Sequence, residues 1–547
     1  MNTKILKLFF ISLSFFLIVS CNSNKLTSDN RVVIGISSDV QTFNSLFAFS
    51  YEESTIADIL YPGLLDLRWN YERGELDVLP LIAESWQWSR DSSFIKFILR
   101  EDVLWSDGTK LTSDDVVFSY DVYSDPDVQS RLLGTFNLFY TEENGHVDIE
   151  KSFKVLSDHE IEMHLPQNAN LDMVKIVVPI VPKHIFENIK RTEIGNHESN
   201  FQPVSCGAFK LIKWNRNQDI SLEADTTSFL FTAGQVAEII FKIIPDYTSR
   251  ILQLKKGDID LVEYVKVEDV NDLKGEQTLL VDDLVGREYD YIGWNNIDPD
   301  KPSQPHKFFG STNIRKALSM AINRKEILDE YLLGKGILAS GPVSPIFKSV
   351  VNTKVNPYQY NPAEAKELLK LEGWKDEDKN GILEKGKTEF KFTLYYPSGN
   401  PLREYTSVVV RNNLKAVGVE AIPEKMEMGT FIDNLFGRKL DSWMAGWGVV
   451  IPLELKPYWY SDPDIASLNF ASYSNTEADK ILDLLETKIS THKKNELIMR
   501  FQERIHDDEP VTFLYWTPNI IVHNRRIKNL KINPYGVIAH CYEWTID

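Results

Sequence analysis

The segment 80–120 constrains the fold of this chain more than any other part of its 547 residues. Phe94–Leu99, FIKFIL, is short, apolar and rich in β-formers, which predicts a strand packed in a sheet. Ser106–Gly108 predicts a tight turn, because glycine tolerates a positive φ. Thr112–Asp115 places capping side chains and negative charge before the apolar Val116, which predicts the start of a helix. The segment therefore predicts a strand, a turn, a second strand and a capped helix.

The N-terminus combines a cationic start with a short apolar core. Lys4 and Lys7 lie at the beginning of Met1–Ser20, and a membrane-spanning helix needs about 20 apolar residues, so we interpret this stretch as a signal peptide. The residues up to Cys21 resemble a bacterial lipobox, in which this cysteine is lipidated and becomes the new N-terminus. Ordinary cleavage with an incidental Cys21 is the alternative. With 21–30 as a polar tether, we expect an exported protein, lipid-anchored to a membrane on its periplasmic or extracellular side.

Length and charge exclude some classes of protein. A chain of 547 residues exceeds what one hydrophobic core usually supports, so two or three lobes are expected. The net charge of −19 and the lack of a basic stripe argue against nucleic-acid binding. Aromatic residues make up 12% of the chain, enough to fill cores and also to line a ligand cleft.

The residues of the most informative segment match a family signature. They read A-E-S-W at 83–86 and F-x-L-R-x-x-V-x-W-S-D-G-x-x-L-T-x-D-D-V at 97–116. This closely resembles the family 5 extracellular solute-binding proteins, the binding components of oligopeptide, dipeptide and related ABC importers. The resemblance extends over roughly 31–547.

Weaker matches continue along the chain. Ser205–Leu211 lies where relatives usually read G-T-G-P-Y-x-L, and Lys256–Asp260 resembles their G-E-I-D turn. Asn313–Leu328 resembles a family helix, with Asn323 replacing the usual aspartate. Tyr360–Trp374 predicts a helix opened by Asn-Pro and closed by glycine.

The resemblance implies the fold. It is an α/β, two-lobed, periplasmic-binding-protein-like fold of the hinge-bending class II, with an additional inserted domain. Carried over to this chain, the expected division is signal peptide 1–20, lipidated tether 21–30, lobe I from 31–50 plus 200–285 plus 508–547, inserted domain 51–199, and lobe III 286–507.

The resemblance also indicates a ligand site. Peptide-binding relatives read A-G-W-x-A-D on one strand, and Gly446 and Trp447 match it. Gly446 lets a ligand backbone approach closely, and Trp447 offers a broad face, although a buried structural tryptophan is the alternative. The aspartate that pairs with the ligand's terminal ammonium in relatives is replaced by Val450. Desolvating an ammonium without a counter-charge costs several kcal/mol, so either another acid, such as Glu454, replaces it, or the ligand has no amine there.

Further ligand-binding candidates rank below Trp447, and each could instead be part of a core. They are Phe43, Asn44, Trp294, Asn295, Tyr458, Trp459 and Tyr515.

Other motifs are weak. Asp376–Gly381 has the oxygen spacing that opens a calcium loop, but Lys387 stands where the bidentate glutamate is needed, so a solvated turn is the better interpretation. Cys206 and Cys541 could pair in an exported compartment, although two cysteines are weak evidence of proximity. No nucleotide-binding or nucleophile-elbow motif occurs. We therefore expect no cofactor, no metal and no enzymatic activity.

The expected function is that of a monomeric solute-binding lipoprotein that captures oligopeptides between its lobes and delivers them to an ABC permease. One alternative is the same transport role for a non-peptide solute, such as an oligosaccharide, an opine or a metal chelate. The other is an envelope interaction protein built on the same scaffold.

Overall fold

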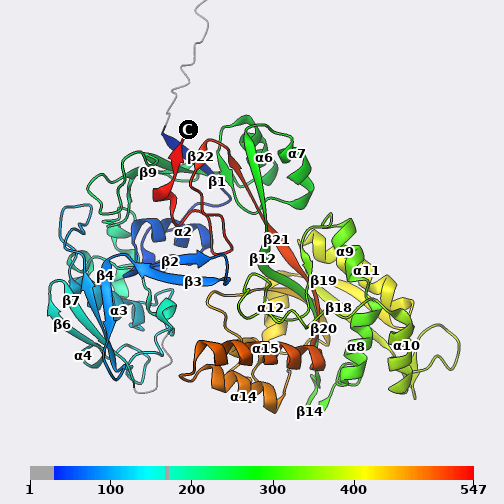
Figure 1. Ribbon diagram of the computed structural model, residues 1–547. Coiled ribbons are helices and arrows are strands. Elements are labelled where there is room, and N and C mark those ends of the chain that lie inside the picture. Colours follow the sequence, from blue (N-terminus) through cyan, green and yellow to red (C-terminus); the bar gives the residue numbers. More distant parts are fainter. Residues whose placement is uncertain (1–29, 167–171) are drawn as a thin grey trace, which may run out of the picture.

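The computed structural model describes residues 30–166 and 172–547 (Figure 1). The predicted signal peptide Met1–Ser20 and the predicted lipidation site Cys21 lie outside the described residues. Within the described part, no helix combines the length and the apolar character that crossing a bilayer requires.

A mixed sheet of 11 strands runs through both halves of the molecule (Figure 1). Strand β1 is parallel to its neighbours β10 and β11, whereas β12 is antiparallel to both β20 and β21. Strand β15 pairs with β21 outside the main path. The order along the sheet is β19 (Glu420–Met426), β18 (Lys391–Pro397), β20 (Ser442–Gly448), β12 (Leu279–Trp294), β21 (Val511–Asn524), β11 (Leu261–Val262), β1 (Arg31–Ile36), β10 (Glu238–Ile243), β9 (Asp219–Ala224) and β8 (Phe209–Asn215), with β15 at Ile337–Leu338.

Two long strands, β12 and β21, connect two lobes. We call the part built on β8, β9, β10, β1 and β11 lobe I, and the part built on β18, β19 and β20 lobe III. The first half of β12 pairs with the lobe I end of β21, and its second half pairs with both β21 and β20. The β12–β21 register shifts between Val285 and Tyr289, so a bulge marks the crossing from one lobe to the other. The residue boundaries predicted for the lobes stay a prediction.

We use the name inserted domain for the described residues of the expected range 51–199. Its most informative segment forms a separate small sheet next to helix α3. Its strand order is β4 (Ala83–Trp88), β5 (Phe94–Leu99), β7 (Glu160–His164) and β6 (Phe153–Ser157). The predicted strands and helix are confirmed: Gly108 has a φ of +89°, and α3 (Ser113–Ser124) begins directly after Thr112. The backbone N–H of Thr112 donates to Asp115 Oδ2 at 2.9 Å, which closes the first turn of the helix.

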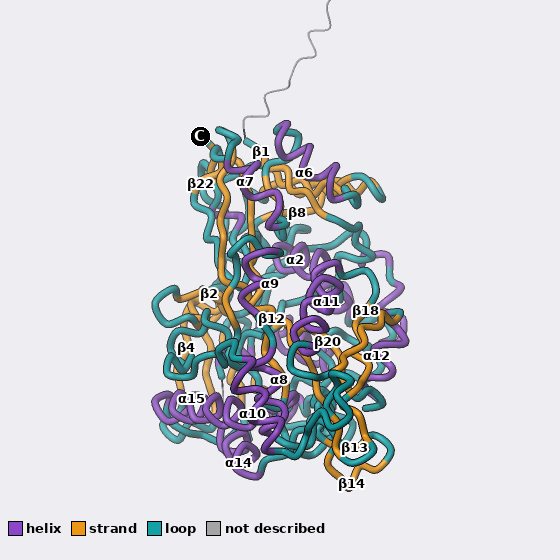
Figure 2. The backbone as a smooth tube through the Cα atoms, turned by 90° about the vertical axis from the view of Figure 1, so that its right-hand side faces the viewer, coloured by secondary structure: helices purple, strands orange, loops and turns teal. Residues whose placement is uncertain are grey.

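Lobe III carries the helices from α8 to α15, which Figure 2 shows gathered around its strands. They are α8 (Thr312–Ala321), α9 (Arg324–Glu330), α10 (Pro362–Leu371), α11 (Pro401–Lys415), α12 (Met428–Phe436), α13 (Lys456–Trp459), α14 (Thr476–Leu485) and α15 (Thr491–Asp508). The helix expected at Asn313–Leu328 is divided into α8 and α9. Asn323 is the reason, because its Oδ1 accepts from the N–H of Glu326 at 3.3 Å and starts α9 as a cap.

The remaining elements are short. The helices are α2 (Tyr51–Leu60), α4 (Ile149–Ser152), α5 (Lys183–Phe186), α6 (Tyr247–Lys256) and α7 (Val270–Lys274). The hairpins pair β2 (Leu65–Asn70) with β3 (Glu75–Pro80), β13 (Ile297–Asp298) with β14 (Lys301–Pro305), β16 (Glu384–Lys385) with β17 (Thr388–Glu389), and β22 (Ile527–Lys528) with β23 (Thr545–Ile546).

A buried polar network ties α8 to the start of β21. The Ser319 hydroxyl donates to Glu509 Oε1 at 2.6 Å and lies 2.6 Å from the hydroxyl of Thr512. Trp294 Nε1 donates to Thr512 Oγ1 at 3.0 Å, and Arg315 Nε donates to the backbone oxygen of Glu509 at 2.8 Å. Because the Glu509 side chain is buried in this network, desolvation raises its pKa to about 7.

The two cysteines of the described part do not pair. Cys206 and Cys541 are both buried and free, although they belong to the same hydrophobic core. Burial raises the pKa of both thiols, which makes them poor nucleophiles.

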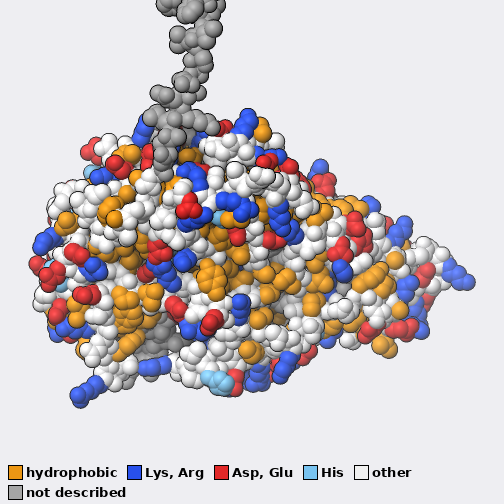
Figure 3. All heavy atoms as spheres, turned by 45° about the horizontal axis from the view of Figure 1, so that its top comes forward, with side chains coloured by type: hydrophobic (Ala, Val, Ile, Leu, Met, Phe, Trp, Pro, Cys, Tyr) orange, Lys and Arg blue, Asp and Glu red, His pale blue; other side chains and the backbone are white. Residues whose placement is uncertain are grey.

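Charges of both signs are mixed on the face of the molecule that Figure 3 shows. Lys and Arg side chains there are interspersed with Asp and Glu rather than gathered by sign.

Candidate functional site

The end of β20 presents the predicted glycine and tryptophan. Gly446 pairs with Asp290 of β12, and Trp447 pairs with Tyr289. Side chains alternate along the strand, so Trp443 and Trp447 face one core of lobe III, whereas Met444 faces the other. Both predicted residues are half-buried, which leaves part of each accessible at the end of the strand.

Trp447 stands in an aromatic cluster. Its ring stacks on Phe470, with a centroid distance of 5.6 Å and an interplanar angle of 24°, and the edge of Tyr458 meets it at 4.9 Å. Tyr458 is also half-buried, whereas Trp459 is buried beneath and packs on Phe513. The cluster thus combines a fixed core side with a partly open aromatic face.

An ion pair that the sequence did not reveal fills the space beside Gly446. Arg403 Nη2 donates to Asp290 Oδ1 at 2.7 Å, and Arg403 Nε donates to Asp290 Oδ2 at 3.1 Å. A Cβ at Gly446 would lie 2.4 Å from Asp290 Oδ1 and 2.5 Å from Arg403 Nη2. Only glycine leaves room for this pair. Burial lowers the pKa of Arg403, but the Asp290 carboxylate more than offsets that and the pKa is raised overall.

Val450 and Glu454 lie in the loop after β20. Val450 is 37% exposed, so no carboxylate stands where relatives have the amine-binding aspartate. Glu454 Oε1 accepts from Lys175 Nζ, a residue of the inserted domain, at 2.6 Å. Glu454, the substitute that the sequence suggested, therefore already has a cationic partner.

The predicted residues of lobe I lie in a buried turn. Phe43 is fully buried and meets the Trp214 ring edge-on at 4.9 Å. Asn44 Nδ2 donates to Asn200 Oδ1 at 2.7 Å, and Asn44 Oδ1 accepts from the N–H of Leu46 at 2.9 Å. Both side chains hold the turn together, and a ligand-binding role for them stays a prediction.

Three further candidates are buried in lobe III. The Trp294 indole donates to Thr512, as described above. Asn295 Nδ2 donates to the backbone oxygens of Arg438 and Leu440 at 3.2 and 3.3 Å. The Tyr515 hydroxyl lies 3.1 Å from that of Thr406. None of the three predicted side chains is exposed, so a direct role in binding also stays a prediction for them.

The inserted domain touches lobe III across a cavity. The Trp69 ring meets Phe347 edge-on at 6.4 Å, and the N–H of Ser349 donates to the backbone oxygen of Arg73 at 2.8 Å. Beside these contacts lies a cavity of about 360 Å³, lined from both sides by residues that include Met173 and Ile451. The inserted domain and lobe III thus meet around a partly open cavity.

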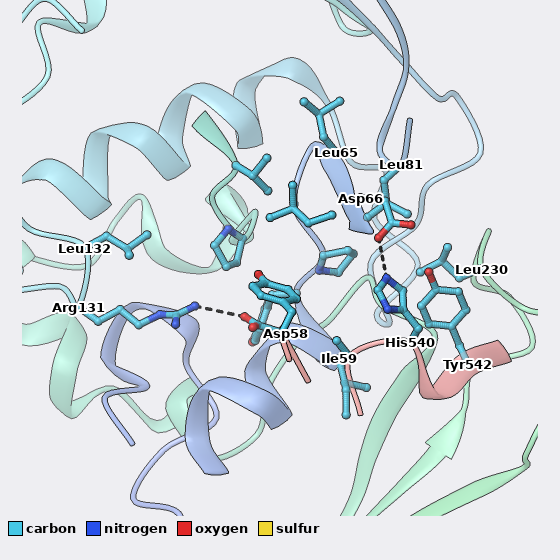
Figure 4. A pocket seen from close by; sticks show the side chains of 18 residues that line it. Asp58, Ile59, Leu65, Asp66, Leu81, Arg131, Leu132, Leu230, His540 and Tyr542 are labelled. Atoms are coloured by element: carbon cyan, nitrogen blue, oxygen red, sulfur yellow. Dashed lines mark hydrogen bonds and ion pairs between the residues drawn. The ribbon is translucent and has the colours of Figure 1, made fainter. Parts of the chain in front are cut away.

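A second cavity, of about 260 Å³, lies within lobe I and the inserted domain (Figure 4). Two ion pairs line it: Arg131 Nη2 to Asp58 Oδ1 at 3.2 Å, and His540 Nε2 to Asp66 Oδ1 at 2.8 Å. Burial acts to raise the pKa of Asp66, but the hydrogen bond from His540 outweighs it with the help of Arg68, and the pKa is lowered. Burial raises the pKa of Asp58, because desolvation outweighs its contact with Arg131.

The acidic loop at Asp376–Gly381 makes hydrogen bonds to its own backbone, and Glu384 Oε2 is left buried without a hydrogen-bond partner among the described residues. The carboxylates of Asp376, Asp378 and Glu384 lie close enough to share an ion. However, Glu384 Oε1 accepts from the N–H groups of Glu377 and Asp378 at 2.7 and 3.1 Å, and Asp376 Oδ2 accepts from that of Gly381 at 3.2 Å. These bonds are those of an exposed turn.

Two lobes joined by two continuous strands, with a partly open aromatic face at the end of β20, define the class of protein that binds a small solute between its lobes. Comparison with known proteins gives the family. The model for bacterial extracellular solute-binding proteins, family 5 Middle, matches residues 77–465, and the chain belongs to this family.

Similar proteins bind different solutes. The chain is 27% identical over 535 residues to the oligopeptide-binding protein AppA of Bacillus subtilis, covering 96% of this chain and 93% of that one. It is 22% identical to heme-binding protein A of Haemophilus influenzae, covering 86% and 84% of the two chains.

Solved structures confirm the fold class. The structure of Bacillus subtilis AppA in complex with a nonapeptide superposes with a TM-score of 0.72 at 26% identity, covering 94% of this chain and 99% of that one. NikZ from Campylobacter jejuni, in complex with Ni(L-His), gives a TM-score of 0.72 at 23% identity, with 94% and 99% coverage. The fold is therefore the predicted two-lobed, periplasmic-binding-protein-like α/β fold.

Proposed function

We propose that this chain is the solute-binding lipoprotein of an ABC importer and that it captures oligopeptides between lobe I and lobe III. The observation that carries the proposal is the end of β20, where the half-buried Trp447 stands beside Gly446 and the Asp290–Arg403 pair. The partly open ring of Trp447 offers a broad face for a side chain of a bound peptide. Similarity to an oligopeptide-binding protein over 96% of the chain supports the same ligand class.

In this proposal, binding of the solute is accompanied by a change in the orientation of the two lobes. The solute enters the open cleft, the lobes rotate about β12 and β21, and water leaves the closed site. The solute must itself contact both lobes, because a ligand with equal affinity for the open and closed forms does not shift the equilibrium between them. In the proposal the closed form is then presented to a membrane permease, while the lipidated Cys21 holds the protein at the membrane after export.

Val450 favours a second candidate, the import of a non-peptide solute. It removes the acid that anchors the amine of a peptide in relatives, and the family includes proteins named for binding heme and a nickel–histidine complex. In this case the Trp447 cluster would stack on a planar or cyclic solute.

Native mass spectrometry of residues 22–547 tests the proposal. Bound masses that differ by amino-acid residues, released by denaturation, support oligopeptide import, whereas one discrete non-peptide mass supports the second candidate. With the ligand in hand, Trp447→Ala should weaken binding by about tenfold or more, since loss of one aromatic anchor costs about 1.4 kcal/mol or more. Trp88→Ala is the matched control, because Trp88 is 37% exposed on β4 of the inserted domain. Equal losses in both variants would contradict a role for the β20 end.

A further inference from the structure

Lobe I presents an acid at the edge of the sheet where its parallel strands end. Strands β1 and β11 run in the same direction, so their carboxyl ends open at one edge of the sheet, the place where α/β sheets generally bind ligands. Glu263 follows β11 directly. Together with Tyr51, the first residue of α2, and with Tyr264, it lines a cavity of about 110 Å³.

The Glu263 carboxylate is poorly neutralised. Its Oε2 accepts from the Tyr51 hydroxyl at 2.8 Å, and among the described residues no Lys, Arg or His nitrogen comes within ion-pair distance of it. Burial raises the pKa of Glu263 to about 7, and the charge of nearby Glu52 adds to the effect. Arg250 lines the same cavity, but its Nη1 donates to the backbone oxygen of Ile244 at 2.6 Å.

Two tyrosine rings flank this carboxylate. Tyr264 is 53% exposed and has a φ of +57°, a left-handed conformation that is uncommon for a bulky residue. Its ring meets the Tyr51 ring edge-on, at 5.6 Å and 81°. A carboxylate between accessible aromatic rings is the environment that an organic ammonium group prefers, because the carboxylate and the faces of the rings both attract a cation.

Strand β12 connects the surroundings of this group of residues with the loop that contains Val450. Arg287 and Glu288 of β12 are near enough to Tyr264 to influence its pKa, which burial raises. The backbone oxygen of Arg287 accepts from the N–H of Val449 at 2.9 Å, one residue before Val450. In Figure 1, β1 lies above the crossing of β12 and β21, on the lobe I side. On the lobe III side of the crossing of β12 and β21, position 450 is therefore a valine, whereas the lobe I side provides Glu263.

We propose that Glu263, flanked by Tyr51 and Tyr264, binds the cationic end of the solute from lobe I, in place of the acid that is missing at Val450. The ligand class is a solute with a primary ammonium group, and for an oligopeptide this is its free N-terminus. The inference rests on the proposed function. It places the anchor for the amine and the aromatic face of Trp447 on opposite lobes, so that one ligand contacts both and favours closure.

The test compares two peptide libraries on the chain without its signal peptide and its predicted lipidated cysteine, residues 22–547. One contains random nonapeptides with free N-termini and the other the same peptides N-acetylated, and the captured peptides are quantified by mass spectrometry. Wild-type protein should bind the free library at least about tenfold more tightly than the acetylated one, the scale of one charge-assisted hydrogen bond to a cation.

The Glu263→Gln variant tests whether Glu263 causes the preference for peptides with a free N-terminus. Glutamine keeps the acceptor for Tyr51 but not the charge, so this variant should bind both libraries equally, at the weaker level. Glu268→Gln is the matched control, with a side chain 64% exposed a few residues along the same segment, and should keep the preference. If Glu263→Gln does not fold, the acetylation comparison on the wild-type protein still decides whether an amine is required.

The failures can be told apart. Equal binding of both libraries by wild-type protein, or a preference that survives Glu263→Gln, overturns this inference and leaves oligopeptide binding intact. Binding of neither library overturns the proposed function together with the inference.

Discussion

Replacing Glu509 by glutamine should make the protein more stable at pH 8 but not at pH 5. The carboxylate is 2% exposed and its main side-chain contact is the hydroxyl of Ser319. Arg315 lies beside it, but its guanidinium donates to backbone oxygens, among them those of Phe309 and Asp508, both at 2.7 Å. Arg324 likewise donates to the backbone oxygen of Phe513 at 2.7 Å. Desolvation therefore outweighs the two arginines and raises the pKa of Glu509 from 4.5 to about 7.

The sign of the effect follows from proton binding. The folded protein holds the Glu509 proton more tightly than the unfolded chain, so below pH 4.5 the burial has no charge cost. As the pH rises from 4.5 through 7 the unfolded chain ionises first, and the free energy of unfolding falls. At about 1.4 kcal/mol per pKa unit, the loss between pH 5 and pH 8 is about 2 kcal/mol.

Urea denaturation followed by tryptophan fluorescence measures this effect. The free energy of unfolding of Glu509→Gln, relative to wild type, should rise by about 2 kcal/mol between pH 5 and pH 8, with the dependence on urea unchanged. Asp507→Asn provides the control. It removes the same charge from a side chain that lies two residues before Glu509 and is 61% exposed. A wild-type protein that gains stability over Glu509→Gln as the pH rises would show that the arginines dominate, and the reasoning would be wrong.

Three other predictions concern packing, lobe contact and redox state. Gly446→Ala should lower stability by about 1–3 kcal/mol, because the added Cβ overlaps the Asp290–Arg403 pair; a melting temperature equal to that of wild type would contradict this. Glu454→Ala removes the contact with Lys175 between lobe III and the inserted domain, and since both side chains are about two-fifths exposed the loss should stay below about 1 kcal/mol. Small-angle scattering should then show a modest shift toward more open forms, and an unchanged radius of gyration would count against the contact. Reducing agent should leave the melting temperature unchanged, because Cys206 and Cys541 are free, and a drop on reduction would reveal a disulfide.

The local fold was predictable where side chains decide it without distant help. Thr112–Asp115 predicted the start of α3. Asn361 and Gly373 predicted where α10 begins and ends. The division between α8 and α9 was missed, although Asn323 carries the signal, because a capping residue inside an otherwise helical pattern reads as part of the helix.

The candidate site was only partly predictable, because its charges are brought together by tertiary structure. Trp447 could be found from its motif. Arg403 and Asp290 are 113 residues apart and meet only when α11 packs on β18 and β19. Glu263 is paired with Tyr51, which is 212 residues away. No local pattern in the sequence records such pairs.

The position of β21 has a consequence for how the chain is made. This strand lies between β11 and β12 in the sheet, yet it is Val511–Asn524, near the end of the chain. A chain growing from its N-terminus can assemble the strands of lobe I and those of lobe III separately, but it cannot join them until residue 511 and those after it emerge. A nascent chain or a fragment ending before Val511 would carry two half-sheets with unpaired edges, which are templates for aggregation. The segment from Val511 onward therefore decides when the two lobes become joined.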